Sequence, residues 1–271
     1  MPAVQGLFIL HSFQCTAGIH PWPRKRKRAK LVDQKDLRPV TLWIPPVPSS
    51  WPFQPREEPP TAEEFEDRAF GELGAGWRGV GQALMLTSGP WVPLEGAYGR
   101  GGLRRCGDLV LRPYRRGGWV RFFNQGSYLS PRRFEREWEI HRALWIQGFP
   151  TVSPAGFGWR RQGLLFEGLF MTRWEEGLPW PRDWRKGLEG LSEIFRAVEA
   201  LAEWGLLAPD LNATNVLLKA GGGVALLDWD RAAFLPGQNL RPAYRLRMAR
   251  SLAKLGAPQE LREAWEGLWK A

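Results

Sequence analysis

The chain has 271 residues, enough for one large domain or two lobes, and its 44% hydrophobic and 24% charged residues exclude a wholly disordered protein. The formal net charge of +10 predicts anionic partners such as phosphorylated substrates, anionic lipid or nucleic acid. Two cysteines, Cys15 and Cys106, cannot build a disulfide scaffold, and the three histidines do not have the spacing of a zinc site.

Residues 1–75 differ in composition from the rest of the chain. The basic run PWPRKRKRAK and the proline-dense run WIPPVPSSWPFQPREEPP keep no helical or strand period, which predicts an extended or disordered N-terminal extension. Its first residues have neither the basic start nor the cleavage site of a secretory signal. No apolar run reaches the ~18 residues of a transmembrane helix, so we expect none.

One helix is predicted inside this extension, over Thr61–Leu73, because Thr61 and Glu64 form a capping-box pattern. A second interpretation is that translation begins later, for example at Met85, so that the extension is not part of the protein. The sequence leaves both interpretations open.

From Tyr98 onward the pattern becomes regular. The run YGRGGLRRCGDLVLRPYRRGG predicts a glycine turn, a strand, a turn at Gly107–Asp108 and the strand LVLRPY. The run SPRRFEREWEIHRALWIQG predicts a helix with Ser130 as its N-cap and Gly148 after its last turn. The run GLLFEGLFMTRW predicts one strand, or two strands that meet at Gly168.

The remaining chain is predicted to be mainly helical. KGLEGLSEIFRAVEALAEWG has the apolar spacing of one amphipathic helix that ends at Gly205. NVLL and VALLD predict two short strands joined into a hairpin by Lys219–Gly223. Two further helices are expected near Ala243–Leu255 and Pro258–Lys270.

This order of elements predicts an α+β protein with two lobes. The N-terminal lobe, residues 76–174, is expected to be a small antiparallel sheet with one helix. The C-terminal lobe, residues 175–271, is expected to be mostly helical.

The stretch APDLNATNVLLKAGGGVALLDWDRA carries the residues with the clearest chemical meaning. Phosphoryl transfer from ATP needs a carboxylate that accepts the proton of the attacking hydroxyl, and an amide and a second carboxylate that hold magnesium. Asp210 lies in a loop after a helix, Asn215 begins the first predicted strand, and Asp228 ends the second. The hairpin should therefore bring both magnesium ligands beside Asp210. The alternative is an Asx-capped loop followed by an ordinary hairpin.

Three upstream features complete the pattern in the expected order. The turn YGRGG supplies Gly99, Gly101 and Gly102, which could cover phosphates, and Arg112 lies on the next predicted strand. Glu137 lies on the first helix, where a carboxylate can pair with the strand cation. Alternatively, Arg112 is an ordinary surface cation and Glu137 belongs to a solvated helix face.

Together, YGRGGLRRCGDLVLRPYRRGG, FEREW, PDLNATNVLL and LLDWDRA resemble the lipopolysaccharide kinase family, in particular the 3-deoxy-D-manno-octulosonic acid (Kdo) kinases, from about Trp91 to Leu255. The resemblance implies a protein-kinase-like two-lobed fold and phosphorylation of a Kdo hydroxyl on a lipid A precursor in lipopolysaccharide core biosynthesis. It implies ATP and Mg²⁺ as cofactors and a peripheral location at the cytoplasmic face of the bacterial inner membrane. A nucleic-acid partner is not expected.

The resemblance also implies a role for each motif residue. These roles are catalytic base for Asp210, magnesium ligand for Asn215 and Asp228, phosphate grip for Arg112 and Glu137, phosphate cover for Gly99, Gly101 and Gly102, and adenine contact for the hinge after Leu169, with Met171.

The chain departs from the kinase pattern at three positions. Arg112 stands where kinases usually have a lysine, and an arginine fork positions phosphate oxygens differently. Ala208 stands where a histidine usually precedes the catalytic acid, which weakens the orientation of that loop. Asn212 replaces the lysine of protein kinases, so the γ-phosphate charge must be met elsewhere, for instance by Arg231.

Other functions remain open from the sequence. An aminoglycoside-type phosphotransferase shares the aspartate-tryptophan pair after the second strand, and a catalytically inactive kinase fold could serve as a membrane- or partner-binding module. The 16 tryptophans suit a membrane surface, although a GC-rich genome would also inflate their number. Nucleic-acid binding through RKRKRAK rests on charge alone.

Overall fold

The computed structural model describes residues 42–57, 62–70, 73–82, 90–94, 102–114 and 127–270, and residues 39–271 form one compact unit. Gly99, Gly101, Met85 and the basic run of the N-terminal extension lie outside the described residues. Among the described residues, no helix combines the length and the apolar character that spanning a membrane requires.

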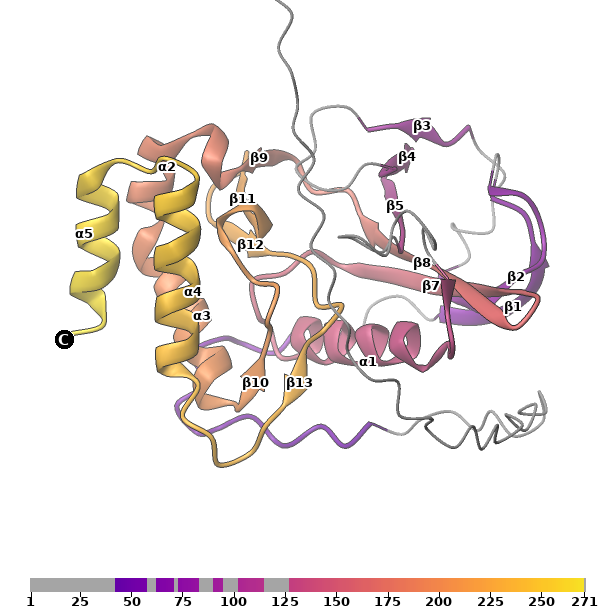
Figure 1. Ribbon diagram of the computed structural model, residues 1–271, viewed down its shortest axis with the longest axis horizontal. Coiled ribbons are helices and arrows are strands. Elements are labelled where there is room, and N and C mark those ends of the chain that lie inside the picture. The colour runs from indigo at the N-terminus through magenta and orange to yellow at the C-terminus, as the bar shows by residue number, and fades with distance from the viewer. Residues whose placement is uncertain are drawn as a thin grey trace, which may run out of the picture. The chain divides into compact units, whose positions relative to one another are not determined.

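The N-terminal half is built on one antiparallel sheet (Figure 1). Its strands follow one another in the order β1-β2-β7-β8-β5-β4-β3, and β6 also pairs with β8. Their bounds are β1 Ala62–Arg68, β2 Trp77–Gln82, β3 Val92–Pro93, β4 Arg104–Cys106, β5 Leu109–Pro113, β6 Ser127–Tyr128, β7 Pro154–Gln162 and β8 Leu165–Arg173. Helix α1, Arg132–Ile146, packs against β7 and β8.

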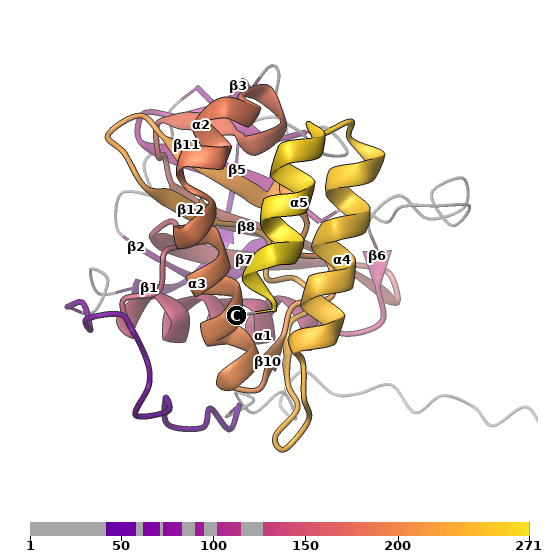
Figure 2. The same cartoon turned by 90° about the vertical axis from the view of Figure 1, so that its left-hand side faces the viewer.

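The C-terminal half contains helices and two small sheets. Helices α3, α4 and α5 pack together (Figure 2). The helices are α2 Trp184–Glu189, α3 Leu191–Glu203, α4 Arg241–Lys254 and α5 Gln259–Leu268. One small sheet has the order β12-β11-β9 and the other pairs β10 with β13. Their bounds are β9 Gly177–Pro179, β10 Leu206–Leu207, β11 Val216–Lys219, β12 Val224–Leu226 and β13 Ala233–Phe234.

The predicted α+β class is confirmed, as is the protein-kinase-like order of a small antiparallel sheet with one helix followed by a mainly helical part. The turn at Gly107–Asp108 joins β4 to β5, and the hairpin β11–β12 forms as expected. The boundary between lobes at residue 174 stays a prediction, since residues 39–271 form one unit.

The helix predicted over Thr61–Leu73 is wrong. Ala62–Arg68 is strand β1, which pairs antiparallel with β2. The side chain of Phe65 is buried in a cluster with Phe70 and Trp77, one of which, Trp77, lies on the paired strand β2. Burying an aromatic side chain contributes several kcal/mol, whereas a capping pattern is worth about 1 kcal/mol, so the tertiary contacts decide the conformation.

Strand β7 was not predicted, because its sequence PAGFGWRRQ contains two glycines that are unfavourable in strands. In the sheet, Gly158 of β7 lies opposite Gly79 of β2. A Cβ atom on Gly79 would lie 2.0 Å from the carbonyl oxygen of Phe157. Gly79 therefore needs to be glycine, because the two backbones approach each other closely there.

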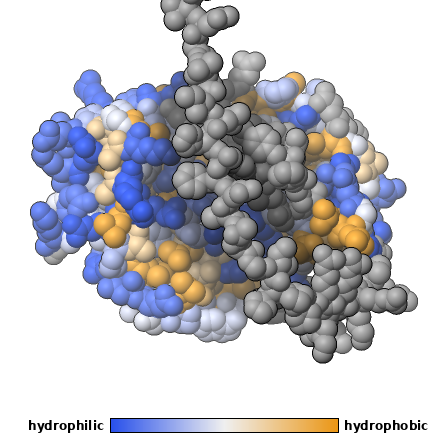
Figure 3. Space-filling model, viewed as in Figure 1, coloured by the Kyte–Doolittle hydropathy of each residue, from blue (hydrophilic) through white to orange (hydrophobic). Residues whose placement is uncertain are grey.

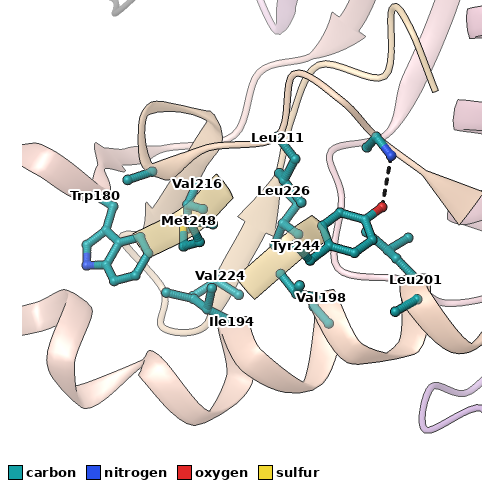
Figure 4. Packing of buried hydrophobic residues seen from close by; sticks show 14 of the residues in the cluster. Trp180, Ile194, Val198, Leu201, Leu211, Val216, Val224, Leu226, Tyr244 and Met248 are labelled. Carbon is teal, nitrogen blue, oxygen red and sulfur yellow. Dashed lines mark hydrogen bonds between the residues drawn. The ribbon is translucent and has the colours of Figure 1, made fainter. Parts of the chain in front are cut away.

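The single helix predicted to end at Gly205 is divided at Gly190 into α2 and α3. Helix α2 lies directly on the indole of Trp180, since a Cβ atom on Gly187 would lie 1.7 Å from the indole nitrogen. Helix α3 presents its apolar face to the C-terminal core, where Ile194, Val198 and Leu201 are fully buried against the β11–β12 hairpin and α4 (Figure 4).

Residues 42–57, which we call the N-terminal strap, contain no helix or strand but pack on the core (purple in Figure 1). The indole nitrogen of Trp51 donates to the carbonyl oxygen of Gln147 after α1, at 2.7 Å. The indole nitrogen of Trp204 after α3 donates to the carbonyl oxygen of Pro45, at 3.0 Å. The strap therefore joins the ends of α1 and α3. The extension predicted over residues 1–75 must be corrected, because the strap and β1 are parts of the folded unit.

Where the atoms are not grey, the face in Figure 3 carries hydrophobic residues in several separate patches among hydrophilic ones. Among the described residues, the large apolar side chains with the greatest exposure are Leu129 at 81% and Leu164 at 74%. Isolated exposed apolar side chains are common on soluble proteins, and they do not by themselves define a membrane-facing surface.

Candidate active site

The loop between β10 and β11 has a defined conformation around Asp210. The side-chain nitrogens of Asn212 and Asn215 both donate to the carbonyl oxygen of Asp210, at 2.7 and 2.9 Å. Asn212 also caps the short turn that follows, since its side-chain oxygen accepts from the backbone N–H of Thr214. The backbone of Asp210 is thereby held while its carboxylate stays 38% exposed. The prediction that the Asn215 side chain folds back to Asp210 is confirmed.

The hairpin returns Asp228 to the same place. The backbone N–H of Leu227 donates to the carbonyl oxygen of Asn215 at 2.8 Å, directly before Asp228. Asp228 has a φ of 69°, and the only other described residue that is not glycine and has a positive φ is Asp67. A left-handed conformation costs energy for such a residue and concentrates at functional sites. This local strain marks Asp228 as a functional candidate.

Arg112 connects this hairpin to α1. From β5, its guanidinium donates to a carboxylate oxygen of Asp228 at 2.9 Å and to Glu137 on α1. The hydroxyl of Tyr114, the first residue after β5, donates to the other oxygen of Glu137. The predicted pairing of Arg112 with Glu137 is therefore present, and the alternatives of a surface cation and a solvated helix face are wrong. The Glu137 side chain is 1% exposed.

Burial and neighbouring charges shift the pKa values of Glu137 and Arg112 in opposite directions. Burial raises the pKa of Glu137 above its usual value, and the positive charge of Arg112 offsets only part of that rise. Burial lowers the pKa of Arg112, but the carboxylates of Glu137 and Asp228 outweigh that effect and hold it above its usual value. Arg112 is therefore a permanent cation at the site.

Two more ion pairs surround the loop. Arg133, on the first turn of α1, donates two hydrogen bonds to Asp230, and this pairing raises the pKa of Arg133. The carboxylate of Asp230, two residues after Asp228, is therefore engaged by Arg133. The guanidinium of Arg231 lies 3.6 Å from the carboxylate of Asp210.

The oxygen atoms of Asp228 and Asn215 suit a magnesium ion whose coordination shell is completed by the phosphates of a nucleotide. Among the described residues, no group of three or more His, Cys, Asp or Glu side chains is arranged so that it could hold a metal ion. Magnesium, however, is usually held by one or two carboxylates together with substrate phosphates and water. Among those same residues, one oxygen of Asp228 bonds to Arg112 and the other makes no hydrogen bond. Asn215 has an amide oxygen as a second possible ligand, and its backbone bonds to Leu227, the residue before Asp228. These residues therefore fit Mg²⁺ bound with phosphate.

The structure gives less information on the residues that the sequence predicts to contact the nucleotide. Met171 is fully buried in β8, opposite Leu111, and its side chain packs inside the sheet. Its contact with adenine stays a prediction, and the accessible part of the expected hinge begins after it. Gly102 is described and has a φ of 96°, whereas Gly99 and Gly101 lie outside the described residues.

Sequence reasoning missed a buried network behind the site. His141 on α1 contacts the carbonyl oxygen of Val152 with its Nε2 at 2.8 Å, so Nε2 carries the proton. The hydroxyl of Thr151 lies 3.1 Å from the same nitrogen and accepts from the indole of Trp229, next to Asp228. A signal was present, because Arg133, Glu137 and His141 recur every four residues and therefore share one face of α1.

Because His141 is buried, we expect the free energy of unfolding to fall in acid. Burial lowers its pKa to about 3, below the ordinary value of 6.5, so between these pH values the unfolded chain binds a proton that the folded chain does not. The free energy of unfolding should fall by about 1.4 kcal/mol per pH unit from this group as the pH drops below 6.5. His141→Gln keeps a donor for Val152 and should show a shallower pH dependence in urea unfolding. Identical slopes for the two proteins would contradict this assignment.

Comparison with known proteins agrees with the motifs. No protein-family model matches the chain. It is 30% identical over 157 residues to 3-deoxy-D-manno-octulosonic acid kinase of Xylella fastidiosa (strain M12), and 31% identical over 168 residues to that of Xanthomonas campestris pv. campestris (strain B100). Each match covers 55% of this chain and 63% of the relative, so the chain spans less than two thirds of these relatives' length. The resemblance predicted from the sequence is confirmed.

Solved structures with a similar backbone include the bifunctional kinase-methyltransferase WbdD, at 15% identity and a TM-score of 0.41, covering 62% of this chain and 38% of that one. Another is a divergent kinase lacking the glycine-rich loop, which regulates membrane ultrastructure of the Toxoplasma parasitophorous vacuole. It has 17% identity and a TM-score of 0.40, and the match covers 59% of each chain.

Proposed function

We propose that the chain is an ATP- and magnesium-dependent kinase that phosphorylates a Kdo hydroxyl on a lipid A precursor. One observation carries the proposal: Arg112 bonds at the same time to Glu137 of α1 and to Asp228 after the hairpin. This contact brings together the residues that we propose as the phosphate-gripping pair and as a metal ligand, which supports the proposal. Phosphoryl transfer requires these parts together.

In the proposed reaction, Asp210 orients the acceptor hydroxyl and takes its proton. The acceptor oxygen forms a bond to the γ-phosphorus while the bond between that phosphorus and the departing ADP oxygen breaks, without a covalent enzyme intermediate. Asn215 and Asp228 would hold Mg²⁺, which neutralises phosphate charge when bound. Arg112 grips the phosphates, and Glu137 and Tyr114 keep its guanidinium in place.

The relatives and the charge of the chain support the proposed acceptor and location. The relatives carry the name Kdo kinase, which supports a Kdo-containing glycolipid as acceptor. The net charge of +10 favours an anionic glycolipid and a negatively charged membrane surface, where each nearby cation contributes about 1 kcal/mol. We therefore infer a peripheral position at the cytoplasmic face of the inner membrane.

The test is transfer of labelled phosphate from ATP to a purified Kdo–lipid A precursor with Mg²⁺, comparing wild type with Asp228→Ala. Label in the glycolipid with wild type alone is the expected result. Binding of Mg–ATP without label would overturn the acceptor and direct attention to soluble sugars and aminoglycosides. Failure to bind Mg–ATP at all would favour an inactive kinase fold that binds a membrane or a partner.

A further inference from the structure

Helix α4 reaches the catalytic loop through one buried phenol. The hydroxyl of Tyr244 donates to the carbonyl oxygen of Leu206 at 2.6 Å and accepts from the backbone N–H of Ala208 at 2.9 Å. The tyrosine is 3% exposed, and burial raises the pKa of its hydroxyl above its usual value, so the hydroxyl stays a donor at neutral pH. Figure 4 shows the ring lying among Val198, Leu201 and Leu226, with its oxygen directed at a backbone nitrogen.

These two backbone groups lie at the end of the small sheet formed by β10 and β13. Strand β10 pairs with β13 through Leu206 and Leu207, and Ala208 is the next residue. Ala208 is 1% exposed, so its N–H cannot be satisfied by bulk water. The hydroxyl of Tyr244 satisfies it and thereby extends the ordered backbone by one residue toward Asp210.

A second side chain of α4 holds the far side of the loop. The hydroxyl of Ser251 accepts from the backbone N–H of Ala213 at 3.1 Å. Tyr244 and Ser251 are seven residues apart, which is two helical turns, so both lie on one face of α4. Asp210 lies between the two anchored residues, Ala208 and Ala213.

The side chain of Ala208 cannot orient the loop, which explains why the loop needs hydrogen bonds from α4. A histidine usually occupies the place two residues before the catalytic acid of a kinase, and the methyl group of Ala208 can form no hydrogen bond in its stead. The loop is instead held through its backbone, by hydroxyl groups from α4. A helix with its apolar face in the C-terminal core is a rigid support for this purpose.

We propose that Tyr244 and Ser251 are positioning residues that place the Asp210 carboxylate relative to Asp228. The proposal rests on the proposed function, because it concerns the geometry of the same phosphoryl transfer. A displacement of about 1 Å can reduce a rate on the order of 10²-fold, so removing an anchor should affect kcat more than nucleotide affinity.

The test begins with Tyr244→Phe, which keeps the buried ring and removes only the hydroxyl. We expect kcat to fall about 10- to 100-fold while the KM for ATP stays within about 2-fold. Ser251→Ala should act in the same direction with a smaller effect, and Ser251→Thr, which keeps the hydroxyl, should restore the rate. Met248→Leu is the matched control, since Met248 is buried on the same helix between the two anchors and has no hydrogen bond to the loop.

Amide hydrogen exchange supplies a readout that does not depend on turnover. In Tyr244→Phe, the amide of Ala208 should exchange faster, whereas amides of the β11–β12 hairpin should keep their protection. A Tyr244→Phe enzyme with wild-type kcat would overturn the positioning role while leaving the proposed function intact. Unchanged exchange at Ala208 would overturn the anchor itself. A wild-type enzyme without any phosphate transfer would instead overturn the proposed function, and the positioning role would fall with it.

Discussion

Asp210→Asn is expected to bind Mg–ATP as tightly as wild type and to transfer phosphate about 10²- to 10⁴-fold more slowly, the usual contribution of a general base. Asparagine has the shape of aspartate but cannot accept a proton. The loop should keep its conformation, because Asn212 and Asn215 bind the backbone carbonyl of Asp210 and not its carboxylate. The lost ion pair with Arg231 is exposed to solvent and contributes little to stability.

The variant Asp228→Asn distinguishes the role of the metal ligand from that of the catalytic base Asp210. It should lower Mg-dependent nucleotide binding as well as transfer, because it removes a charged oxygen ligand and a partner of Arg112. Asp183→Asn is the matched control, since Asp183 caps α2 and asparagine also caps helices well. Isothermal titration of Mg–ATP and single-turnover transfer distinguish the variants. Full activity of Asp210→Asn would show that another group accepts the proton.

A chain that begins at Met85 is expected not to fold. It lacks the strap and strands β1 and β2, and with them the buried side chains of Phe65 and Trp77. It also loses Trp51, whose ring packs against Phe149 and Trp204. Loss of each large buried aromatic side chain costs about 3–5 kcal/mol, so the sum is on the order of 10 kcal/mol. That approaches or exceeds the whole stability of a typical domain.

The control for this truncation is a chain that begins at Pro39, because residues 39–271 form one compact unit. It should unfold at the same temperature as the full chain when followed by circular dichroism. The Met85 chain should be insoluble or should show no cooperative transition. A soluble, cooperatively unfolding Met85 chain with kinase activity would restore the interpretation that the extension is not part of the protein.

Much of the site could be predicted because its chemistry lies in short motifs. Asp210, Asn215 and Asp228 come from one stretch, and the hairpin between them forms through contacts close in sequence. Tyr114 could also have been found, since residues two apart on a strand lie on the same face and it follows Arg112 at that spacing. The buried contacts among His141, Thr151 and Trp229 could not be predicted from these motifs, because they join segments that are far apart in the sequence.

The sequence by itself determined the α+β class, the β4–β5 turn and the β11–β12 hairpin, because turn residues and apolar periodicity act over a few residues. The tertiary structure alone decided that Ala62–Arg68 is a strand and that the strap binds the ends of α1 and α3. It also decided that Tyr244 holds the loop 36 residues earlier in the chain. Such contacts depend on partners far away in sequence. The free energy gained by burying an aromatic ring, and the cost of leaving a buried backbone N–H without a partner, both exceed the small local propensities that a sequence pattern reports.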